Sequence, residues 1–257
     1  MATQDAGPDE ILARALAYPY ERLSEGYLLA DGHVLPLDRS GLDERLERLG
    51  EPLGERMALV GYGSNAAPSQ LRRKLAAHAP GWAVPVAPAR LLGADAVFSA
   101  HITRYGAIPA TLHPSAGTVI DAVVTLLSPR QAELVRASEG GNYDLVPLDP
   151  GRLELPDGLG LPRTVHAYLS RHGALAIDGG PVALRAVPSR GRTLPDATEA
   201  QMLARVAAEL TPGGGVRALV LECVADPRRR RRRVAELARH AMQDPGGAAP
   251  GWYARPV

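Results

Sequence analysis

The segment Met57-Ala-Leu-Val-Gly-Tyr-Gly-Ser-Asn65 decides the fold prediction. Met57 to Val60 is a short apolar run typical of a buried strand, and it stops at a glycine-containing turn, Gly61 to Asn65. A helix with leucines on its buried face is expected from about Pro68. Such a turn can present several backbone N–H groups to a carboxylate or an oxyanion, although it can equally be a plain strand-to-helix connection.

The turn fits none of the common glycine-rich signatures. A dinucleotide-binding fingerprint requires a third glycine inside a βαβ unit, and a P-loop requires a Gly-Lys-Ser or Gly-Lys-Thr sequence. A Gly-x-Ser-x-Gly nucleophile elbow is also absent, because Ala66 and Ala67 follow Asn65. We therefore interpret the segment as a turn that could bind a ligand through its backbone.

The composition suits one globular domain with extensions. The 257 residues are 46% hydrophobic and 22% charged, and 27 Gly and 23 Pro predict many turns. A net charge of +1 gives no reason to expect a nucleic-acid partner or an anionic membrane. Cys223 is the only cysteine, which excludes an intrachain disulfide and a cysteine-based zinc site, and we expect no metal and no cofactor.

Neither a targeting segment nor a membrane span is visible in the sequence. The first ten residues lack the basic and apolar regions of a signal peptide, and no run reaches 18 apolar residues. We therefore expect a cytoplasmic protein. Lys74 is the only lysine among 29 basic residues, an imbalance that we attribute to coding bias.

The order of the remaining elements favours an α+β fold. Before the opening segment we expect a helix over 9–16, a hairpin over 26–37 around Asp31-Gly32, and a helix capped by Ser40. After it we expect strands at 89–98, 109–112, 118–127, 144–148 and 163–169, and helices at 129–137, 198–210 and from Pro227, capped by Asp226. Residues 216–224 fit a strand or a helix, and the tail from Asp244 is expected to be loose. Irregular order with short strands is typical of α+β rather than doubly wound proteins.

Glu139 is the second feature of interest. It stands between a short predicted helix and a Gly140-Gly141-Asn142 turn. Two glycines directly after it allow the backbone to bend tightly, which is compatible with a carboxylate that points inward, although a lone Glu is usually a surface charge.

Taken in order, these motifs resemble the γ-glutamylcyclotransferase-like family. They are a Tyr-Gly-Ser-Asn loop at Tyr62 to Asn65, an Ala-Thr stretch and long apolar strand from Pro109 to Leu126, a Glu-Gly motif within Leu134 to Tyr143, and a later strand with Tyr168. The resemblance covers about residues 57–173 and rests on the order and spacing of short motifs.

The resemblance implies a small mixed, mostly antiparallel β-barrel with peripheral helices. We expect this core domain over 56–187, between a helix-and-hairpin extension at 1–55 and a helical C-terminal extension at 188–257 that packs on the core. The family's roles imply Glu139 as the general acid/base. They imply substrate binding by Tyr62, Gly63, Ser64, Asn65, Ala66, Ala67, Tyr143 and Tyr168.

The implied activity is a lyase-type cyclisation. The α-amine of a γ-glutamyl amide attacks its own γ-carbonyl and releases 5-oxoproline and an amine or amino acid. The hypothesis requires Glu139 to be buried against the Tyr62–Ala67 loop rather than exposed to bulk solvent.

Other functions stay open at this point. Val135 and Asp121 replace an Asp and a Gly of the family pattern, which leaves room for an amide hydrolase or acyl transferase on a related γ-acyl substrate. A non-catalytic ligand-binding or scaffold module is a further alternative, and the sequence also leaves a homodimer open. Arg228 to Arg233 are interpreted as a solvated, partly frayed basic turn, with acidic-partner or nucleic-acid contact as weaker readings, because six successive helical residues point in all directions.

Overall fold

A long antiparallel β-ribbon organises the protein. In the computed structural model, which describes residues 6–38, 40–155 and 164–242, strand β4 (Ala83–Phe98) pairs with β5 (Ala110–Leu127) along nearly its whole length. The ladder shifts register between Leu92 and Ala94, where Gly93 adopts a φ of +74°. Such an irregularity lets a ribbon bend strongly, so both strands can pair with other strands in two parts of one sheet.

The two predicted strands at 109–112 and 118–127 are therefore one strand. Pro114 and Gly117 resemble strand breakers in the sequence, and Gly117 adopts a φ of +77°. They lie at the register shift opposite Gly93, where a proline and a glycine are tolerated without ending the strand. The predicted strand at 89–98 is likewise longer and begins at Ala83.

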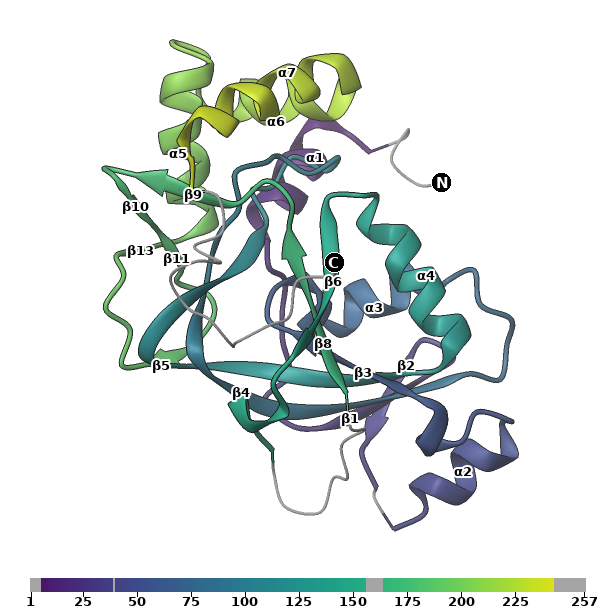
Figure 1. Ribbon diagram of the computed structural model, residues 1–257. Coiled ribbons are helices and arrows are strands. Elements are labelled where there is room, and N and C mark those ends of the chain that lie inside the picture. The colour runs from purple at the N-terminus through teal and green to yellow at the C-terminus, as the bar shows by residue number, and fades with distance from the viewer. Residues whose placement is uncertain (1–5, 39, 156–163, 243–257) are drawn as a thin grey trace.

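The described strands form a mixed, mostly antiparallel sheet (Figure 1). Its main order is β13-β11-β4-β5-β3-β8-β6, with β3 (Met57–Gly61), β6 (Tyr143–Leu148), β8 (Val165–Ser170), β11 (Ala183–Leu184) and β13 (Asp196–Ala197). Four further strands join it at the side: β1 (Tyr27–Ala30), β2 (His33–Pro36), β7 (Leu153–Glu154) and β12 (Ser189–Arg190). A separate small sheet contains β9 (Ala174–Ile177), β10 (Gly180–Pro181) and β14 (Ala241–Met242). No ladder among the described strands joins β13 to β6, so the α+β class and the mostly antiparallel sheet are confirmed without a closed barrel.

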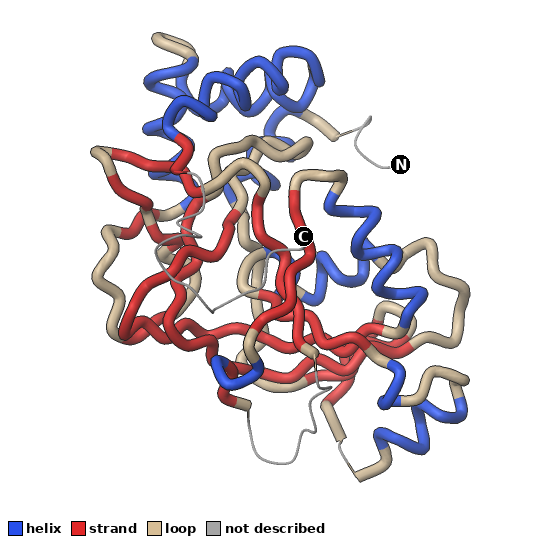
Figure 2. Tube along the Cα trace, in the orientation of Figure 1, coloured by secondary structure: helices blue, strands red, loops and turns tan. Residues whose placement is uncertain are grey.

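The helices gather in two groups around the sheet. They are α1 (Pro8–Leu16), α2 (Leu42–Arg48), α3 (Pro68–Lys74), α4 (Pro129–Glu139), α5 (Glu199–Leu210), α6 (Gly215–Ala225) and α7 (Pro227–Leu237). Helices α5, α6 and α7 lie with α1 at one end of the molecule, and α3 and α4 flank the strands elsewhere (Figure 2). Residues 216–224 are thus helical, because Leu219, Val220 and Cys223 share one buried face at helical spacing.

Local signals in the sequence explain most of the element ends. The hairpin turn has positive φ at Asp31 and Gly32, as expected, and Asp226 caps α7 by accepting from the N–H of Arg228 at 2.7 Å. The predicted cap at Ser40 is wrong, because Gly41 is the N-cap of α2 while the Ser40 hydroxyl donates to Asp38. The six arginines are helical throughout, so the frayed-turn reading is also wrong, and the tail from Asp244 lies outside the described residues.

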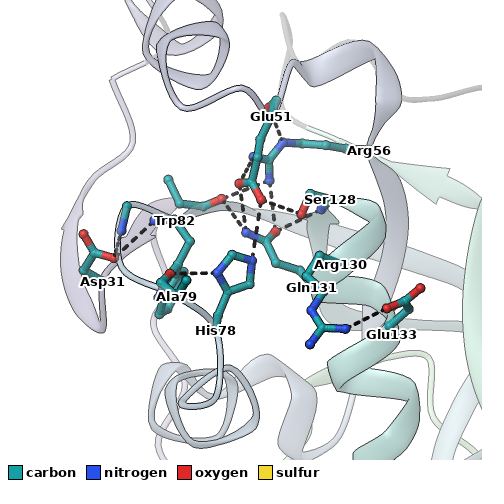
Figure 3. A network of polar contacts seen from close by, with 12 residues as sticks. Asp31, Glu51, Arg56, His78, Ala79, Trp82, Ser128, Arg130, Gln131 and Glu133 are labelled. Carbon is teal, nitrogen blue, oxygen red and sulfur yellow. Dashed lines mark hydrogen bonds and ion pairs between the residues drawn. The ribbon is translucent and has the colours of Figure 1, made fainter.

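Arg56 lies in a network of polar contacts that includes Glu51 and Gln131 (Figure 3). Its side chain is fully buried, and one guanidinium nitrogen donates to the carbonyls of Ala83 and Leu126 and to Gln131 Oε1, at 2.9 to 3.2 Å. The other terminal nitrogen forms an ion pair with Glu51 at 3.0 Å. One buried cation therefore joins the start of β4, the end of β5 and the first turn of α4.

Replacing Arg56 by Met should lower the free energy of unfolding by about 3–5 kcal/mol, because Glu51 and two carbonyls lose a buried partner. Urea titration followed by circular dichroism measures the loss. Arg130→Gln is the matched control, since its i,i+3 pair with Glu133 is exposed and should contribute less than about 1 kcal/mol. Equal losses in the two variants would contradict a central role for Arg56.

Candidate functional site

A pocket of about 720 Å³ lies where the turn after β3, the end of α4 and helix α7 meet. The predicted residues Tyr62, Gly63, Ser64, Asn65, Glu139, Tyr143 and Tyr168 all line it. Ala66 and Ala67 are fully buried and lie outside the lining, so their side chains have no direct access to a ligand in this pocket.

The turn after β3 offers backbone donors to the pocket. Its short 3-10 turn is closed by bonds from Ala66 N to Gly63 O and from Ala67 N to Ser64 O, at 3.0 and 3.1 Å. Within the described part of the chain, the N–H groups of Gly63, Ser64 and Asn65 have no acceptor. A Cβ on Gly63 would stand 2.6 Å from the Tyr18 hydroxyl oxygen, so only glycine allows this close approach.

Helix α4 delivers Glu139 to the pocket as its last residue. Ser128 and Gln131 form a capping box at the start of the helix, and Gly140 ends it in the left-handed conformation with φ of 60°. Gly141 also has a positive φ, of 77°. The two glycines thus turn the chain directly after the carboxylate, as the sequence predicted.

Glu139 is held by two side chains from the turn and from α3. Lys74 Nζ lies 2.7 Å from Glu139 Oε1 and 2.5 Å from Asn65 Oδ1. Asn65 Nδ2 donates to the same Oε1 at 3.2 Å. The Glu139 and Lys74 side chains are only 11% and 7% exposed. Glu139 Oε2 accepts no hydrogen bond from any described residue, so one carboxylate oxygen is fixed and the other is free for a ligand.

Lys74 is a pocket residue that the sequence analysis missed. It was set aside as part of a coding bias, yet it is the one basic side chain inserted between Asn65 and Glu139. An ammonium group is a compact point charge, whereas a guanidinium is planar and larger, so an arginine fits poorly between two acceptors that lie this close. A lone lysine in an arginine-rich chain was the available signal.

The pocket tyrosines are neutral phenols that shape its wall. The Tyr62 hydroxyl donates to the Tyr168 carbonyl, and the Tyr143 hydroxyl donates to the Ala110 carbonyl at 3.0 Å. Burial raises the pKa of Tyr62, Tyr143 and Tyr168 above the usual value of 10.0. The Tyr168 hydroxyl is buried and has no partner among the described residues, and it has almost no accessible surface.

Tyr18 and two stacked histidines complete the wall. Tyr18, which follows α1, lines the pocket, and its hydroxyl accepts from Ala110 N at 2.8 Å. On another side His101 stacks on His172 with 4.5 Å between ring centroids. Burial lowers the pKa of both rings, so they are neutral near pH 7.

Val135 and Asp121, which depart from the family pattern, lie away from the pocket, and so does Asp144. Val135 is fully buried in a hydrophobic cluster with Leu71 and Leu75. Asp121 is exposed on β5, and Asp144 forms an ion pair with Arg171 at 2.6 Å. None of them is among the lining residues, so their side chains do not shape this pocket.

The described residues contain no group of three or more His, Cys, Asp or Glu side chains that could hold a metal ion. Within the same residues, no helix is both long enough and apolar enough to cross a bilayer.

No family model and no curated protein matches the chain. It is similar to a solved gamma-glutamyl cyclotransferase, with 19% identity and a TM-score of 0.36 over 45% of this chain and 67% of that one. It is also similar to a protein from Arabidopsis thaliana solved in solution (16%, TM-score 0.31, 46% of this chain and 70% of that one) and to an uncharacterized protein from Homo sapiens (18%, 0.34, 53% and 73%). The first of these structures bears the name of the family that the sequence motifs resemble. At these identities and TM-scores, the similarities give no information about the reaction.

The lowered histidine pKa values predict acid sensitivity. His101, His166 and His172 all have pKa values below 6.5 because of burial. The unfolded chain therefore takes up protons below pH 6.5 that the folded protein does not, so stability is full above that pH and falls as the pH decreases. The buried His101 contributes up to about 1.4 kcal/mol per pH unit, and the half-buried His166 and His172 contribute less because solvent screens their charge.

Urea unfolding from about pH 7.5 to about pH 5 tests this dependence. His101→Gln should flatten the pH profile, whereas the exposed His33→Gln serves as the control and should leave it unchanged. A wild-type profile that stays flat over this range would contradict the prediction.

Proposed function

We propose that the protein cyclises γ-glutamyl amides, releasing 5-oxoproline and an amine, with Glu139 as the general acid/base. The observation that carries this proposal is the position of Glu139: it is nearly buried, bonded directly to Asn65 of the Tyr62–Ala67 loop, and keeps one carboxylate oxygen unoccupied by described residues. This is the geometry that the hypothesis requires, and an exposed Glu139 would have removed its basis.

The first step is a proton transfer. The α-ammonium of the glutamyl group gives a proton to Glu139 Oε2, and the resulting amine nitrogen attacks the γ-carbonyl carbon of the same group. Because nucleophile and electrophile belong to one molecule, no enzyme nucleophile is needed. Holding the two ends together can lower the barrier by about 7–11 kcal/mol in well-aligned cases.

The second step breaks the amide bond. The oxyanion that forms on the γ-carbonyl is stabilised by the unpaired N–H groups of Gly63, Ser64 and Asn65. Its collapse expels the leaving nitrogen, which takes the first proton back from Glu139. Glu139 then accepts the second proton of the ring nitrogen and passes it to the released amine, which departs as an ammonium ion. One C–N bond forms, one breaks, no water is consumed, and Glu139 returns to its ionised state.

Lys74 acts as a positioning residue in this scheme. Its ion pair fixes Oε1 in place and leaves Oε2 unoccupied by described residues. The bond from Lys74 to Asn65 fixes the loop to the same group, so the base and the N–H donors are aligned together.

Hydrolysis and acyl transfer, the two alternative reactions, have less support than cyclisation. Val135 and Asp121, which motivated hydrolysis or acyl transfer, do not line the pocket. The domain limits at 56–187, the closed barrel, the cytoplasmic location and a homodimer stay predictions.

Glu139→Gln should lower kcat/KM for 5-oxoproline release by about 10²- to 10⁴-fold, because glutamine is isosteric and cannot take the proton. Mass spectrometry of 5-oxoproline after incubation with γ-glutamyl amino acids, γ-glutamyl amines and glutathione measures the effect. A linear glutamate product would indicate hydrolysis instead. Release that does not depend on Glu139, or no release by the folded wild type, would overturn the proposal.

Lys74→Arg should lower kcat/KM by about 10²-fold although the charge is retained, because the larger guanidinium displaces Asn65 and Glu139 by an ångström or more. Arg72→Lys, an exposed and equally conservative change on α3, is the matched control and should keep full activity. Circular dichroism checks that both variants are folded. An active Lys74→Arg enzyme would show that the shape of this cation is unimportant.

A further inference from the structure

Tyr18 lies in the pocket wall beside the turn that carries the proposed oxyanion donors. Its side chain is only 5% exposed and belongs to the same hydrophobic cluster as Val60 and Tyr62. Its hydroxyl oxygen lies so close to Gly63 that a Cβ at this residue would stand 2.6 Å away. The same oxygen accepts a hydrogen bond from Ala110 N at 2.8 Å. It is thus held between the turn after β3 and the start of β5.

The Tyr18 hydroxyl acts as an acceptor inside the protein, and its own proton has no acceptor among the described residues. Two neighbouring tyrosines differ in this respect. Tyr62 donates its proton to the Tyr168 carbonyl, and Tyr143 donates its proton to the Ala110 carbonyl. Because a buried donor without an acceptor is costly, the Tyr18 O–H marks a point where a ligand atom can bind.

Tyr18 is a neutral phenol and therefore a donor. Burial raises its pKa above the usual value of 10.0, and Tyr62, Glu199 and Glu139 raise this pKa further by their electrostatic effect. The hydrogen bond from Ala110 acts in the opposite direction and is outweighed. The hydroxyl thus keeps its proton near pH 7, whereas the carboxyl group that serves as base is a separate residue, Glu139.

The ligand atom that meets this O–H must be a hydrogen-bond acceptor close to Gly63. In the proposed cyclisation, the N–H groups of Gly63, Ser64 and Asn65 stabilise the γ-carbonyl oxygen, so this oxygen is the acceptor beside the turn. It carries a partial charge in the bound amide and nearly a full negative charge after attack by the amine. A fixed donor therefore stabilises the transition state more than the bound substrate.

We propose that Tyr18 is a catalytic residue whose hydroxyl donates a hydrogen bond to the γ-carbonyl oxygen as negative charge develops there. This inference rests on the proposed cyclisation and adds a side-chain donor to the backbone donors of the turn. The hydroxyl keeps its proton throughout, so the balance of atoms and charge in the reaction is unchanged. Tyr18 lies outside the 57–173 segment of the family resemblance, so the N-terminal segment takes part in the chemistry.

Tyr18→Phe should lower kcat for 5-oxoproline release by about 10²- to 10³-fold and change KM by less than about threefold, because the lost donor acts mainly on the transition state. Tyr20→Phe, two residues further along and outside the lining of this pocket, is the matched control and should keep the wild-type kcat. Circular dichroism checks that both variants are folded. A wild-type kcat in Tyr18→Phe would overturn the proposal.

A second readout separates catalysis from support of β5, since Tyr18→Phe also leaves Ala110 N without its partner. Each γ-glutamyl amide is compared with its γ-thioamide, in which a sulfur atom, a weaker hydrogen-bond acceptor, replaces the γ-carbonyl oxygen. The ratio of the two kcat values should be at least about tenfold smaller in Tyr18→Phe than in the wild type, because the lost donor served the oxygen. A displacement of β5 alone would slow both substrates alike, so an unchanged ratio would overturn the proposal.

A binding measurement separates this inference from the proposed reaction. The probes are the glutamate analogue with a phosphonate in place of the γ-carboxylate, which is tetrahedral and anionic, and glutamine, whose γ-amide is planar and neutral. Both are titrated calorimetrically into the full-length wild type and Tyr18→Phe. The variant should bind the phosphonate at least about tenfold more weakly and glutamine less than about threefold more weakly.

The outcomes distinguish the two proposals. If the folded wild type releases no 5-oxoproline but its affinity for the phosphonate depends on Tyr18, the reaction is wrong and the oxyanion donor stands. If the wild type releases 5-oxoproline and Tyr18→Phe matches it in kcat and in the thioamide ratio, the reaction stands and the role of Tyr18 is wrong. If the wild type releases none and phosphonate binding is the same in the variant, both are wrong.

Discussion

The contact between Lys74 and Glu139 unites the two halves of the candidate site. One partner ends α3, directly after the Tyr62–Ala67 turn, and the other ends α4, 65 residues later. The local sequences of α3 and α4 do not determine where the ends of these two helices lie relative to each other. A charge pair that is nearly buried is strong only where the geometry is good, and here Asn65 supplies additional hydrogen bonds on both sides of it. The position of the carboxylate, the turn and the pocket wall thus depends on one short polar chain.

Backbone conformation adds a second constraint, because the site requires glycine where side chains would collide or strain the chain. Gly63 lies against the Tyr18 hydroxyl, and Gly140 ends α4 in a left-handed conformation that other residues rarely adopt. Both glycines position other groups of the site, and neither has a side chain that takes part in the proposed reaction. They bring donors and a carboxylate to one pocket from two different elements, the turn after β3 and the end of α4.

The sequence predicted the parts of the site that local signals describe. Glu139 and Tyr62 to Asn65 were found because a turn motif and a helix-ending glycine pair leave a pattern in neighbouring residues. Lys74 leaves no such pattern, since its role depends on a contact across 65 residues. The α+β class followed from element order, but the length of β5 did not, because Pro114 looks the same at a register shift as at a strand end. The helical state of 216–224 was undecidable locally and was set by burial of Leu219 and Val220 against the rest of the protein.

The terminal segments are part of the pocket rather than additions to it. Tyr18 from the N-terminal segment supports Ala110 and limits residue 63 to glycine, while α7 contributes Arg230 and Arg231. A single hydrophobic cluster includes Ala15, residues of the sheet, and residues of α5 and α6, so these segments share the core that positions Glu139's surroundings. The proposed cyclisation needs a base, a turn with N–H donors and the amine of the substrate. Residues 57–173 alone contain the base and the turn. The terminal segments therefore contribute part of the wall around the pocket that holds Glu139.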